Sequence, residues 1–305
     1  MEPELEHVDC DLCGKDDSRP VFEGVTDSEL GVPGAFDIVA CNGCGLIYLN
    51  PRVPPADVHR YYPPGSYGPY QRENPLILAL KHWFWRRDKR SIEALIGSSG
   101  AILEVGCARG DFLNSLSNGY ALYGLEPDAT AAAIAAGRGR ATVWQGSFED
   151  FTFPPELRFD LVILAFVLEH LPSVRVAFEK LRRLGKAGSK LVITTANFDS
   201  WERKCFGRYW HCLDAPRHYC VLTEATFREY ARMHGFSVLS VTYSRVPNDW
   251  IGGIGRFCRA RDWDTLARFF NIRNRAVAAA FLPLSLLAGL CKRSSRFTFV
   301  LERDA

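Results

Sequence analysis

Four cysteines near the start of the chain occur as two pairs with metal-ligand spacing, Cys10-Asp-Leu-Cys13 and Cys41-Asn-Gly-Cys44. A glycine follows each pair directly, as a tight turn with positive φ favours. Two such turns bring four thiolates together, the tetrahedral sulfur set that zinc prefers. We therefore expect a structural zinc site, because four protein ligands leave zinc no open position for catalysis. Two coincidental pairs, a disulfide and a redox pair are the alternatives.

A second candidate site is the loop Glu104-Val-Gly-Cys-Ala-Arg-Gly110, which follows a short apolar run at 101–105. A glycine loop after a strand lies where open α/β sheets bind ligands. The nicotinamide-binding fingerprint would need glycines at 106, 108 and 111, whereas the chain has Gly106, Ala108 and Asp111. The spacing argues against that fingerprint and favours another nucleotide-type cofactor.

The chain around this loop alternates between short apolar runs and helical patterns. We expect strands at 101–105, 120–125, 141–144, 159–166 and 190–195, and helices at 76–96, 111–117, 130–136 and 174–184. Such alternation predicts a parallel sheet with helices on both faces. A helix at 223–234 capped by Thr223, a strand at 236–243 and a final strand at 296–301 follow.

The loop resembles that of class I S-adenosylmethionine-dependent methyltransferases, an acidic-x-Gly-x-Gly-x-Gly sequence. Glu104, Gly106 and Gly110 match it, and Ala108 replaces the middle glycine. With the later motifs, the resemblance covers residues 101 to 196. It implies a doubly wound, mostly parallel, Rossmann-like α/β sheet whose last strand is antiparallel, and S-adenosylmethionine as the cofactor.

The same resemblance assigns cofactor contacts after the next three strands. Glu126 corresponds to the acid that takes both ribose hydroxyls, and two carboxylate oxygens match a vicinal diol. Ser147 and Phe148 correspond to the residues that line the adenine pocket. Ala165 lies within 159–171, which resembles the fourth strand and the loop beside the sulfonium and the acceptor.

Methyl transfer sets the catalytic requirement. A sulfonium methyl group is already activated, so the protein needs to align the acceptor and, for a hydroxyl or a carbon acid, remove its proton. His218 is our candidate base, because the corresponding loop of the family folds over the acceptor and histidine titrates near neutral pH. Glu169 and His170 are second candidates at the end of the fourth strand. The alternative is that His218 only caps or packs its loop.

Aromatic residues suggest two further hypotheses. Trp201, Tyr209, Trp210 and His211 would form an acceptor wall suited to a sugar or aryl ring. Tyr62 would reach over the cofactor from the Pro- and Tyr-rich segment, as would Tyr67. Packing in the core, or on the domain surface, is the alternative for each group.

A cysteine module followed by this domain resembles the zinc-bearing sugar C-methyltransferases of bacterial deoxysugar pathways and shorter relatives associated with surface-glycan and secondary-metabolite synthesis. The likeness rests on the two cysteine pairs, on Gly-Leu-Ile-Tyr-Leu-Asn-Pro at 45–51 and on Tyr-Tyr-Pro at 61–63. We expect a zinc-ribbon-like module at 1–60, a linker at 61–74 and a methyltransferase domain at 75–305. The implied acceptor is a sugar, nucleotide sugar or glycan, methylated on oxygen or carbon.

Composition is that of a folded protein of about two domains, with 305 residues, 47% hydrophobic and 24% charged. The net charge of +2 gives little support to nucleic acid as a partner, and we expect the basic cluster at 81–90 to be a solvated helix face. RNA methylation, a catalytically degenerate cofactor-binding scaffold and a dehydrogenase are the rival functions.

Ten cysteines, an acidic start with no apolar leader and the lack of an 18-residue apolar run predict a reducing cytoplasm and no transmembrane span. The apolar stretch 276–290, interrupted by Pro283, is expected to be a buried or interface helix. Peripheral membrane contact through this stretch is the alternative.

Overall fold

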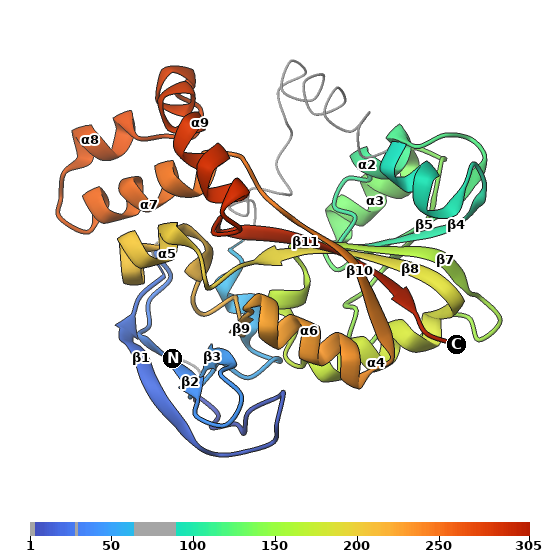
Figure 1. Cartoon of the computed structure of the whole chain (residues 1–305), viewed down its shortest axis with the longest axis horizontal. Coiled ribbons are helices and arrows are strands. Elements are labelled where there is room, and N and C mark those ends of the chain that lie inside the picture. Colours follow the sequence, from blue (N-terminus) through green and yellow to red (C-terminus); the bar gives the residue numbers. More distant parts are fainter. Residues whose placement is uncertain (1–3, 28–29, 64–89) are drawn as a thin grey trace.

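The computed structural model describes residues 4–27, 30–63 and 90–305, which form two β-sheets with helices around them (Figure 1). The larger sheet consists of β4 (Gly100–Val105), β5 (Tyr120–Glu126), β6 (Thr142–Gln145), β7 (Phe159–Ala165), β8 (Gly185–Ala196), β10 (Phe236–Tyr243) and β11 (Arg296–Arg303). Its strand order is β10-β11-β8-β7-β4-β5-β6. Strands β4 to β8 are parallel, whereas β11 pairs antiparallel with both β8 and β10. This is the doubly wound, mostly parallel sheet with an antiparallel last strand that the sequence predicts.

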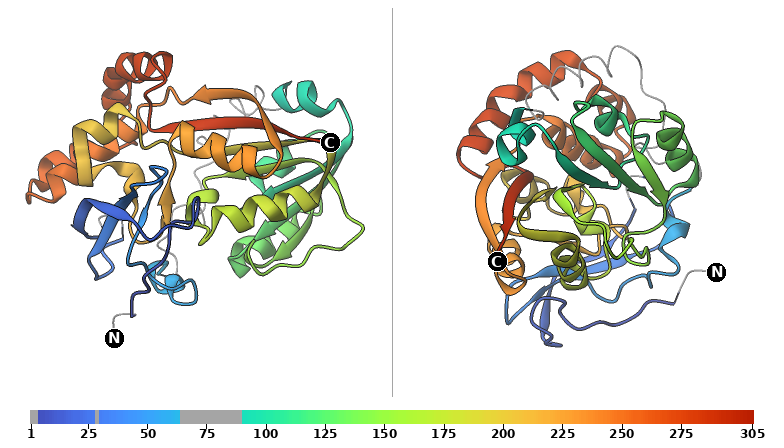
Figure 2. Two further views of the ribbon diagram at one scale, coloured as in Figure 1. Left: turned by 60° about the horizontal axis from the view of Figure 1, so that its bottom comes forward. Right: turned by 90° about the vertical axis from the view of Figure 1, so that its right-hand side faces the viewer.

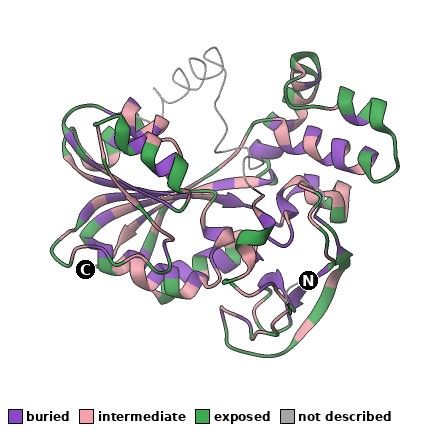
Figure 3. Cartoon of the chain, turned by 180° about the vertical axis from the view of Figure 1, so that it is seen from behind, coloured by how far each residue is buried: buried purple, intermediate pink, exposed green. Residues whose placement is uncertain are grey.

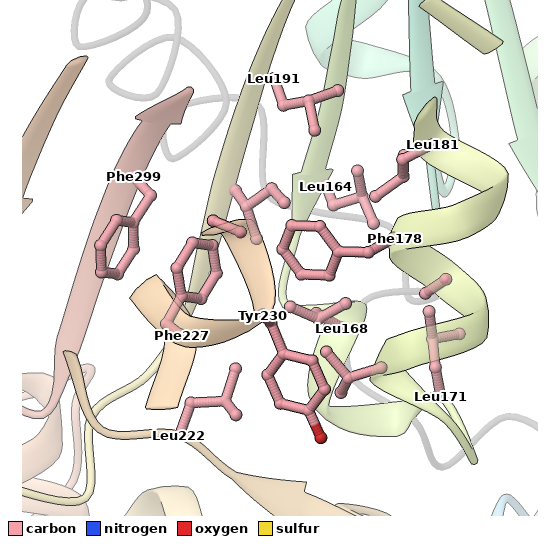
Figure 4. Close-up of a cluster of buried hydrophobic side chains, with 14 of the residues drawn as sticks. Leu164, Leu168, Leu171, Phe178, Leu181, Leu191, Leu222, Phe227, Tyr230 and Phe299 are labelled. Carbon is pink, nitrogen blue, oxygen red and sulfur yellow. The ribbon is translucent and has the colours of Figure 1, made fainter. Parts of the chain in front are cut away.

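Helices α4 (Val174–Leu184) and α6 (Glu224–Met233) cover one face of this sheet (Figure 1). The buried residues of α4 recur at the three- and four-residue spacing of an amphipathic helix. Thr223 begins α6 with a reciprocal capping box to Thr226. Between the helices, Phe178 stacks on Tyr230 at a centroid distance of 6.1 Å (Figure 4). This core fixes the loops at both helix N-termini, where the candidate catalytic residues lie.

The opposite face packs against α2 (Asp111–Ser115), α3 (Ala129–Gly137) and the helical residues 90–96. Helix α3 buries three small side chains, Ala131, Ala132 and Ala135. The small side chains permit a close approach, and a Cβ atom at Gly110 would lie only 2.9 Å from the Cβ of Ala135. The glycine loop is therefore clamped between the sheet and this helix.

The N-terminal segment forms a second, four-stranded antiparallel sheet from β1 (Ser18–Val25), β2 (Phe36–Cys41), β3 (Ile47–Leu49) and β9 (Cys220–Val221). Strand β9 lies about 170 residues further along the chain and pairs with β3. Figures 1 and 2 show this sheet at the end of the molecule where α5 (Trp201–Phe206) lies. The N-terminal module thus completes its sheet with a strand from the segment predicted to belong to the methyltransferase domain.

Three helices lie between β10 and β11: α7 (Asn248–Arg259), α8 (Asp264–Phe269) and α9 (Arg275–Leu290). The sequence predicts α9 but not α7, whose Ile-Gly-Gly-Ile-Gly run has low helix propensity. Close packing overrides that propensity: a Cβ atom at Gly252 would lie 2.7 Å from the His211 ring, and one at Gly253 2.3 Å from Phe206. Figure 3 shows that α8 and α9 carry many exposed residues.

The strands expected at 101–105, 120–125, 141–144, 159–166, 236–243 and 296–301 and the helices expected at 111–117, 130–136, 174–184 and 223–234 are confirmed to within a few residues at each end. The strand expected at 190–195 is longer, because β8 begins at Gly185. The start of the helix expected at 76–96, Tyr67 and most of the basic cluster at 81–90 lie outside the described residues. Within the described ranges, no helix has both the length and the apolar content needed to cross a bilayer.

Candidate active site and cysteine cluster

The glycine loop joins β4 to α2 with three residues at positive φ: Gly106 at 71°, Ala108 at 46° and Gly110 at 69°. Glycine adopts such angles freely, whereas Ala108 pays a steric cost. A Cβ atom at Gly106 would lie 2.7 Å from Cγ2 of Val167. The loop predicted to bind the cofactor therefore lies against the loop that leads to Glu169 and His170.

Glu126, the last residue of β5, points its carboxylate at this loop. Its Oε2 accepts a hydrogen bond from the backbone N–H of Ala108 at 2.8 Å, and its Oε1 accepts one from Asp128 at 3.0 Å. These bonds fix the carboxylate in place, and a fixed pair of carboxylate oxygens is the kind of acceptor that a vicinal diol needs. The position fits the ribose-binding role that the sequence assigns to Glu126.

Glu104 lies on β4 beside Glu126 and is buried. Its Oε2 has no hydrogen-bond partner among the described residues. Burial, together with the nearby charge of Glu126, raises the pKa of Glu104 to about 8. A buried carboxyl group without a partner is suited to a ligand that brings a donor or a positive charge.

The other predicted cofactor residues differ in exposure. Ala165 is the last residue of β7 and is exposed at the carboxyl end of that strand. Phe148 is 4% exposed, belongs to the main core and lies under the ammonium group of Lys180 at 5.1 Å. The hydroxyl of Ser147 donates to Asp150 at 2.8 Å and shapes the turn that carries Phe148. Their contact with adenine stays a prediction.

The three candidate catalytic residues are brought together by the fold. A carboxylate oxygen of Glu169 and one ring nitrogen from each of His170 and His218 lie within 4.8 Å of one another. The two imidazole rings meet edge to face, with their centroids 4.5 Å apart. Glu169 is fully buried, and its Oε2 accepts a hydrogen bond from Thr195 at 2.8 Å. Burial raises the pKa of Glu169 and lowers that of His170 to about 3, so the His170 ring is neutral at physiological pH.

The tautomer of His218 follows from one contact. Its Nδ1 lies 2.9 Å from the backbone carbonyl oxygen of Cys212, which can only accept a hydrogen bond. The proton therefore sits on Nδ1, and Nε2 carries the free lone pair. Nε2 lies 4.0 Å from Oδ2 of Asp214. Burial alone would raise the pKa of Asp214, but hydrogen bonds from Arg217 hold it below its usual range, so a carboxylate faces the ring.

Tyr62 and Arg217 are parts of this site that sequence spacing could not place. The Tyr62 hydroxyl lies 2.9 Å from Nδ1 of His170. Arg217 is fully buried and binds both carboxylate oxygens of Asp27, at 2.7 and 2.8 Å, and those of Asp214, at 2.7 and 3.0 Å. The guanidinium also donates to the backbone carbonyl of Tyr61 at 3.0 Å. The N-terminal module and the His218 loop are thus joined beside the histidines.

The predicted aromatic wall is not formed as a unit. Trp210 is fully buried, and its indole N–H donates to Ser295 at 2.7 Å, so it belongs to the core. Tyr209 packs edge to face against Phe257 of α7 at 5.6 Å. For these two residues the packing alternative holds.

The four N-terminal cysteines lie together, with all Sγ atoms within 4.8 Å of one another. Cys10 and Cys44 are 3.4 Å apart, as are Cys13 and Cys41. Each Cys-x-x-Cys segment forms a turn in which the glycine after the second cysteine donates its N–H to the carbonyl of the first cysteine, at 2.7 and 2.9 Å. Both glycines have positive φ, 72° at Gly14 and 77° in the second turn, as the sequence predicts.

The first cysteine turn also contacts the start of α4. Asp11, between Cys10 and Cys13, accepts hydrogen bonds from the backbone N–H of Arg175 at 3.1 Å and from the Tyr230 hydroxyl at 2.7 Å. The Arg175 guanidinium donates to the Asp11 carbonyl at 2.9 and 3.0 Å. The cysteine cluster is therefore anchored to the helix that follows the Glu169 and His170 loop.

Comparison with known proteins agrees with this geometry. The strand order and the Glu104 to Gly110 loop define a class I S-adenosylmethionine-dependent methyltransferase. A family model described as a methyltransferase domain matches residues 80–241, more than half of the chain, and the chain belongs to that family. A solved Galdieria sulphuraria protein, assigned as a sarcosine dimethylglycine methyltransferase, shares the fold with a TM-score of 0.51 at 15% identity, over 78% of this chain and 91% of its own.

Two curated relatives are ubiquinone biosynthesis O-methyltransferases. The protein from Rhodopseudomonas palustris (strain HaA2) is 26% identical over 163 residues, 49% of this chain and 64% of its own length. The protein from Bradyrhizobium diazoefficiens is 27% identical over 141 residues, 44% of this chain and 56% of its own. The chain therefore matches less than two thirds of each relative.

Proposed function

We propose that this chain transfers the methyl group of S-adenosylmethionine to a hydroxyl group of a small molecule, with His218 as the general base. The observation that carries the proposal is the convergence of two residue sets at one edge of the sheet. The glycine loop lies against Val167 at Gly106. Glu169, two residues after Val167, is the first member of the cluster that also includes His170 and His218. A cofactor site and a proton-accepting group thus occupy adjoining loops, as in-line transfer requires.

Glu126 and the glycine loop have side chains that fit the cofactor. Glu126 offers two fixed oxygens to a diol, and the unpartnered Oε2 of Glu104 suits a cationic or donor group. When bound, S-adenosylmethionine supplies an activated methyl group. The chain itself binds and orients the acceptor and accepts its proton.

The contacts of His218 distinguish its two ring nitrogens. The Nδ1 proton is held by the Cys212 carbonyl, so Nε2 is the nitrogen that would accept the proton of the acceptor. The imidazolium that forms is stabilised by the Asp214 carboxylate, which Arg217 keeps ionised. His170, neutral at physiological pH, adds no positive charge that would oppose this step.

Two observations bear on the acceptor. The curated relatives are O-methyltransferases, which supports a hydroxyl over a carbon acid. The cysteine pairs and the Tyr61-Tyr-Pro63 segment support a sugar, nucleotide sugar or glycan, through their likeness to sugar C-methyltransferases. We propose a hydroxyl of such a sugar acceptor, and a screen that includes phenols and catechols tests this choice.

We also propose that the four cysteines bind a structural zinc ion. Zinc bonded to four sulfurs at about 2.3 Å places those sulfurs roughly 3.8 Å apart, a spacing that sulfurs 3.4 to 4.8 Å apart can adopt with small shifts. The paired turns support this assignment, because their backbone N–H groups and positive-φ glycines form the knuckles in which each cysteine pair chelates one ion. The ion would hold the module in place and supply no catalytic position.

The test is methyl transfer from labelled S-adenosylmethionine by His218→Ala, with the exposed His7→Ala as the control. We expect kcat to fall by roughly 100- to 10,000-fold in His218→Ala, the usual contribution of a general base, with the Kd for the cofactor unchanged. The control should keep full activity, since His7 is exposed and pairs with Asp16 on the surface. Full turnover by His218→Ala would refute the assignment of the base.

A further inference from the structure

Exposed apolar side chains are concentrated in residues 259–293, which include α8 and α9 and which we name the α8–α9 face. Of the thirteen large hydrophobic residues that are exposed in the described chain, eight lie within 263–290. On the α8 side, Trp263 is 50% exposed, Phe269 54% and Ile272 51%. Such a concentration marks a surface that meets another apolar phase, because single exposed hydrophobic residues are normally scattered.

Helix α9 is apolar on its outer side as well as its inner side. Its buried residues include Val277, Ala288 and Gly289. Its outer side carries Leu282, Leu286 and Leu290, at 42%, 40% and 65% exposure, and spaced by four residues. A helix that is apolar all round is normally surrounded by apolar material on both sides. Only the inner side meets such material in the described structure.

Charge on the same face is strongly positive. Residues 259–293 contain seven arginines and lysines and two aspartates, all exposed, a net charge of +5. The whole chain carries +2, so the remaining residues are net negative. Arg261 lies over the Phe257 ring at 3.6 Å, so basic and aromatic groups are interleaved. Basic residues beside exposed aromatic and leucine side chains characterise surfaces that lie in the interface of an anionic bilayer.

We propose that the α8–α9 face docks on the surface of an anionic lipid bilayer, with the apolar side chains in the headgroup and acyl boundary and the arginines on the phosphates. The proposal is independent of the function proposed above. A second copy of this chain on the same face would bring two surfaces of net charge +5 together, whereas lipid phosphates neutralise them. No described helix is long enough to span the bilayer, so the contact is peripheral.

Docking would also orient the candidate active site. Helix α7, which precedes the face, packs on the loop before His218: Arg256 donates to the Trp210 carbonyl at 3.3 Å, and Cys212 contacts Asp249 at 3.4 Å. A bilayer on the α8–α9 face would therefore hold this loop at a fixed height above the lipid.

The experiment is flotation of the full chain with vesicles, one set of phosphatidylcholine alone and one of equal parts of phosphatidylcholine and phosphatidylglycerol. We expect binding to the mixed vesicles, at least about tenfold weaker binding to the neutral ones, and a loss with rising salt. The double variant Leu286→Gln/Leu290→Gln should bind about tenfold more weakly or worse, and Leu239→Gln, an exposed leucine on β10, should bind as the wild type does.

Three outcomes would overturn the proposal. The first is the absence of binding to either vesicle set. The second is binding that Leu239→Gln reduces as much as the α9 double variant, which would indicate nonspecific adsorption. The third is a dimer in lipid-free solution that the α9 double variant dissociates, which would assign the face to a second copy.

Discussion

The glycine loop with Glu126 and the histidine cluster differ in how the chain builds them. Glu104, Gly106, Gly110 and Glu126 come from one β-α-β unit, and hydrogen bonds within that unit hold them. The histidine cluster depends on the Arg217 bridge to Asp27, 190 residues away, and on Tyr62. The first site is held by contacts within one unit of the chain, whereas we expect the second to need the docked N-terminal sheet. Damage to the N-terminal module should therefore impair the acceptor side and spare cofactor binding.

Removing one cysteine of the proposed zinc site is the strongest way to test this contrast. Structural zinc contributes roughly 10 to 16 kcal/mol to the folding of small peptides, so we expect Cys41→Ser to unfold the β1–β3 part of the small sheet. Zinc content, measured by atomic absorption, should fall to background, and amide exchange across residues 4–63 should accelerate. Methyl transfer should fall while cofactor affinity stays.

Cys205→Ser is the control for that variant, because Cys205 is exposed on α5 and outside the cluster. It should keep zinc and activity. Retention of one zinc per chain by Cys41→Ser, with unchanged exchange, would contradict the proposed site.

The Arg217 bridge offers a second break between the regions. Arg217→Met removes the guanidinium that binds both Asp27 and Asp214, and breaking a buried ion pair in this way typically costs about 3 to 5 kcal/mol. Urea denaturation should show this loss in the free energy of unfolding. Arg232→Met, which breaks an exposed pair with Glu229, should lose less than about 1 kcal/mol. Equal effects of the two variants would show that the bridge does not hold the module.

The sequence could predict what local spacing encodes. Strand ends, the glycine loop and the paired cysteine turns each depend on residues less than one element apart, so periodicity and turn chemistry find them. The contacts of Tyr62 and Arg217 have no such signal, since their partners lie far away in the sequence. Tyr62 contacts His170, 108 residues away, and Arg217 binds Asp27, 190 residues away. Helix α7 was missed for a related reason: its glycines oppose a helix locally and are explained only by the side chains packed against them.

The pH dependence of stability sharpens the comparison on the cofactor side. The folded-state pKa of Glu104, about 8, lies above the usual value of about 4.3. Between these values the folded chain holds a proton that the unfolded chain has lost, so this residue's contribution to stability falls as pH rises through the window, by up to about 1.4 kcal/mol per unit.

Glu104→Gln should remove this residue's part of the pH dependence of the unfolding free energy. Urea denaturation between pH 5 and pH 8, the window set by the two pKa values, measures it. Glu93→Gln, at an exposed position, should leave the slope as in the wild type. An unchanged slope in Glu104→Gln would mean that the buried carboxyl is ionised in the folded chain.

The smallest effect is expected at Ala108, the residue that departs from the family's glycine pattern. Its φ of 46° costs about 1 to 2 kcal/mol for a residue with a Cβ atom, and Ala108→Gly removes that strain. The same change frees the unfolded chain by about 0.5 to 1 kcal/mol, so we expect a net gain in unfolding free energy of about 1 kcal/mol or less. Gly106→Ala should instead lose stability, because its Cβ would meet Val167 at 2.7 Å. Opposite signs in the two variants, measured by thermal denaturation, would show that a methyl group is unfavourable at both positions, whereas a loss of stability in Ala108→Gly would contradict the strain assigned to Ala108.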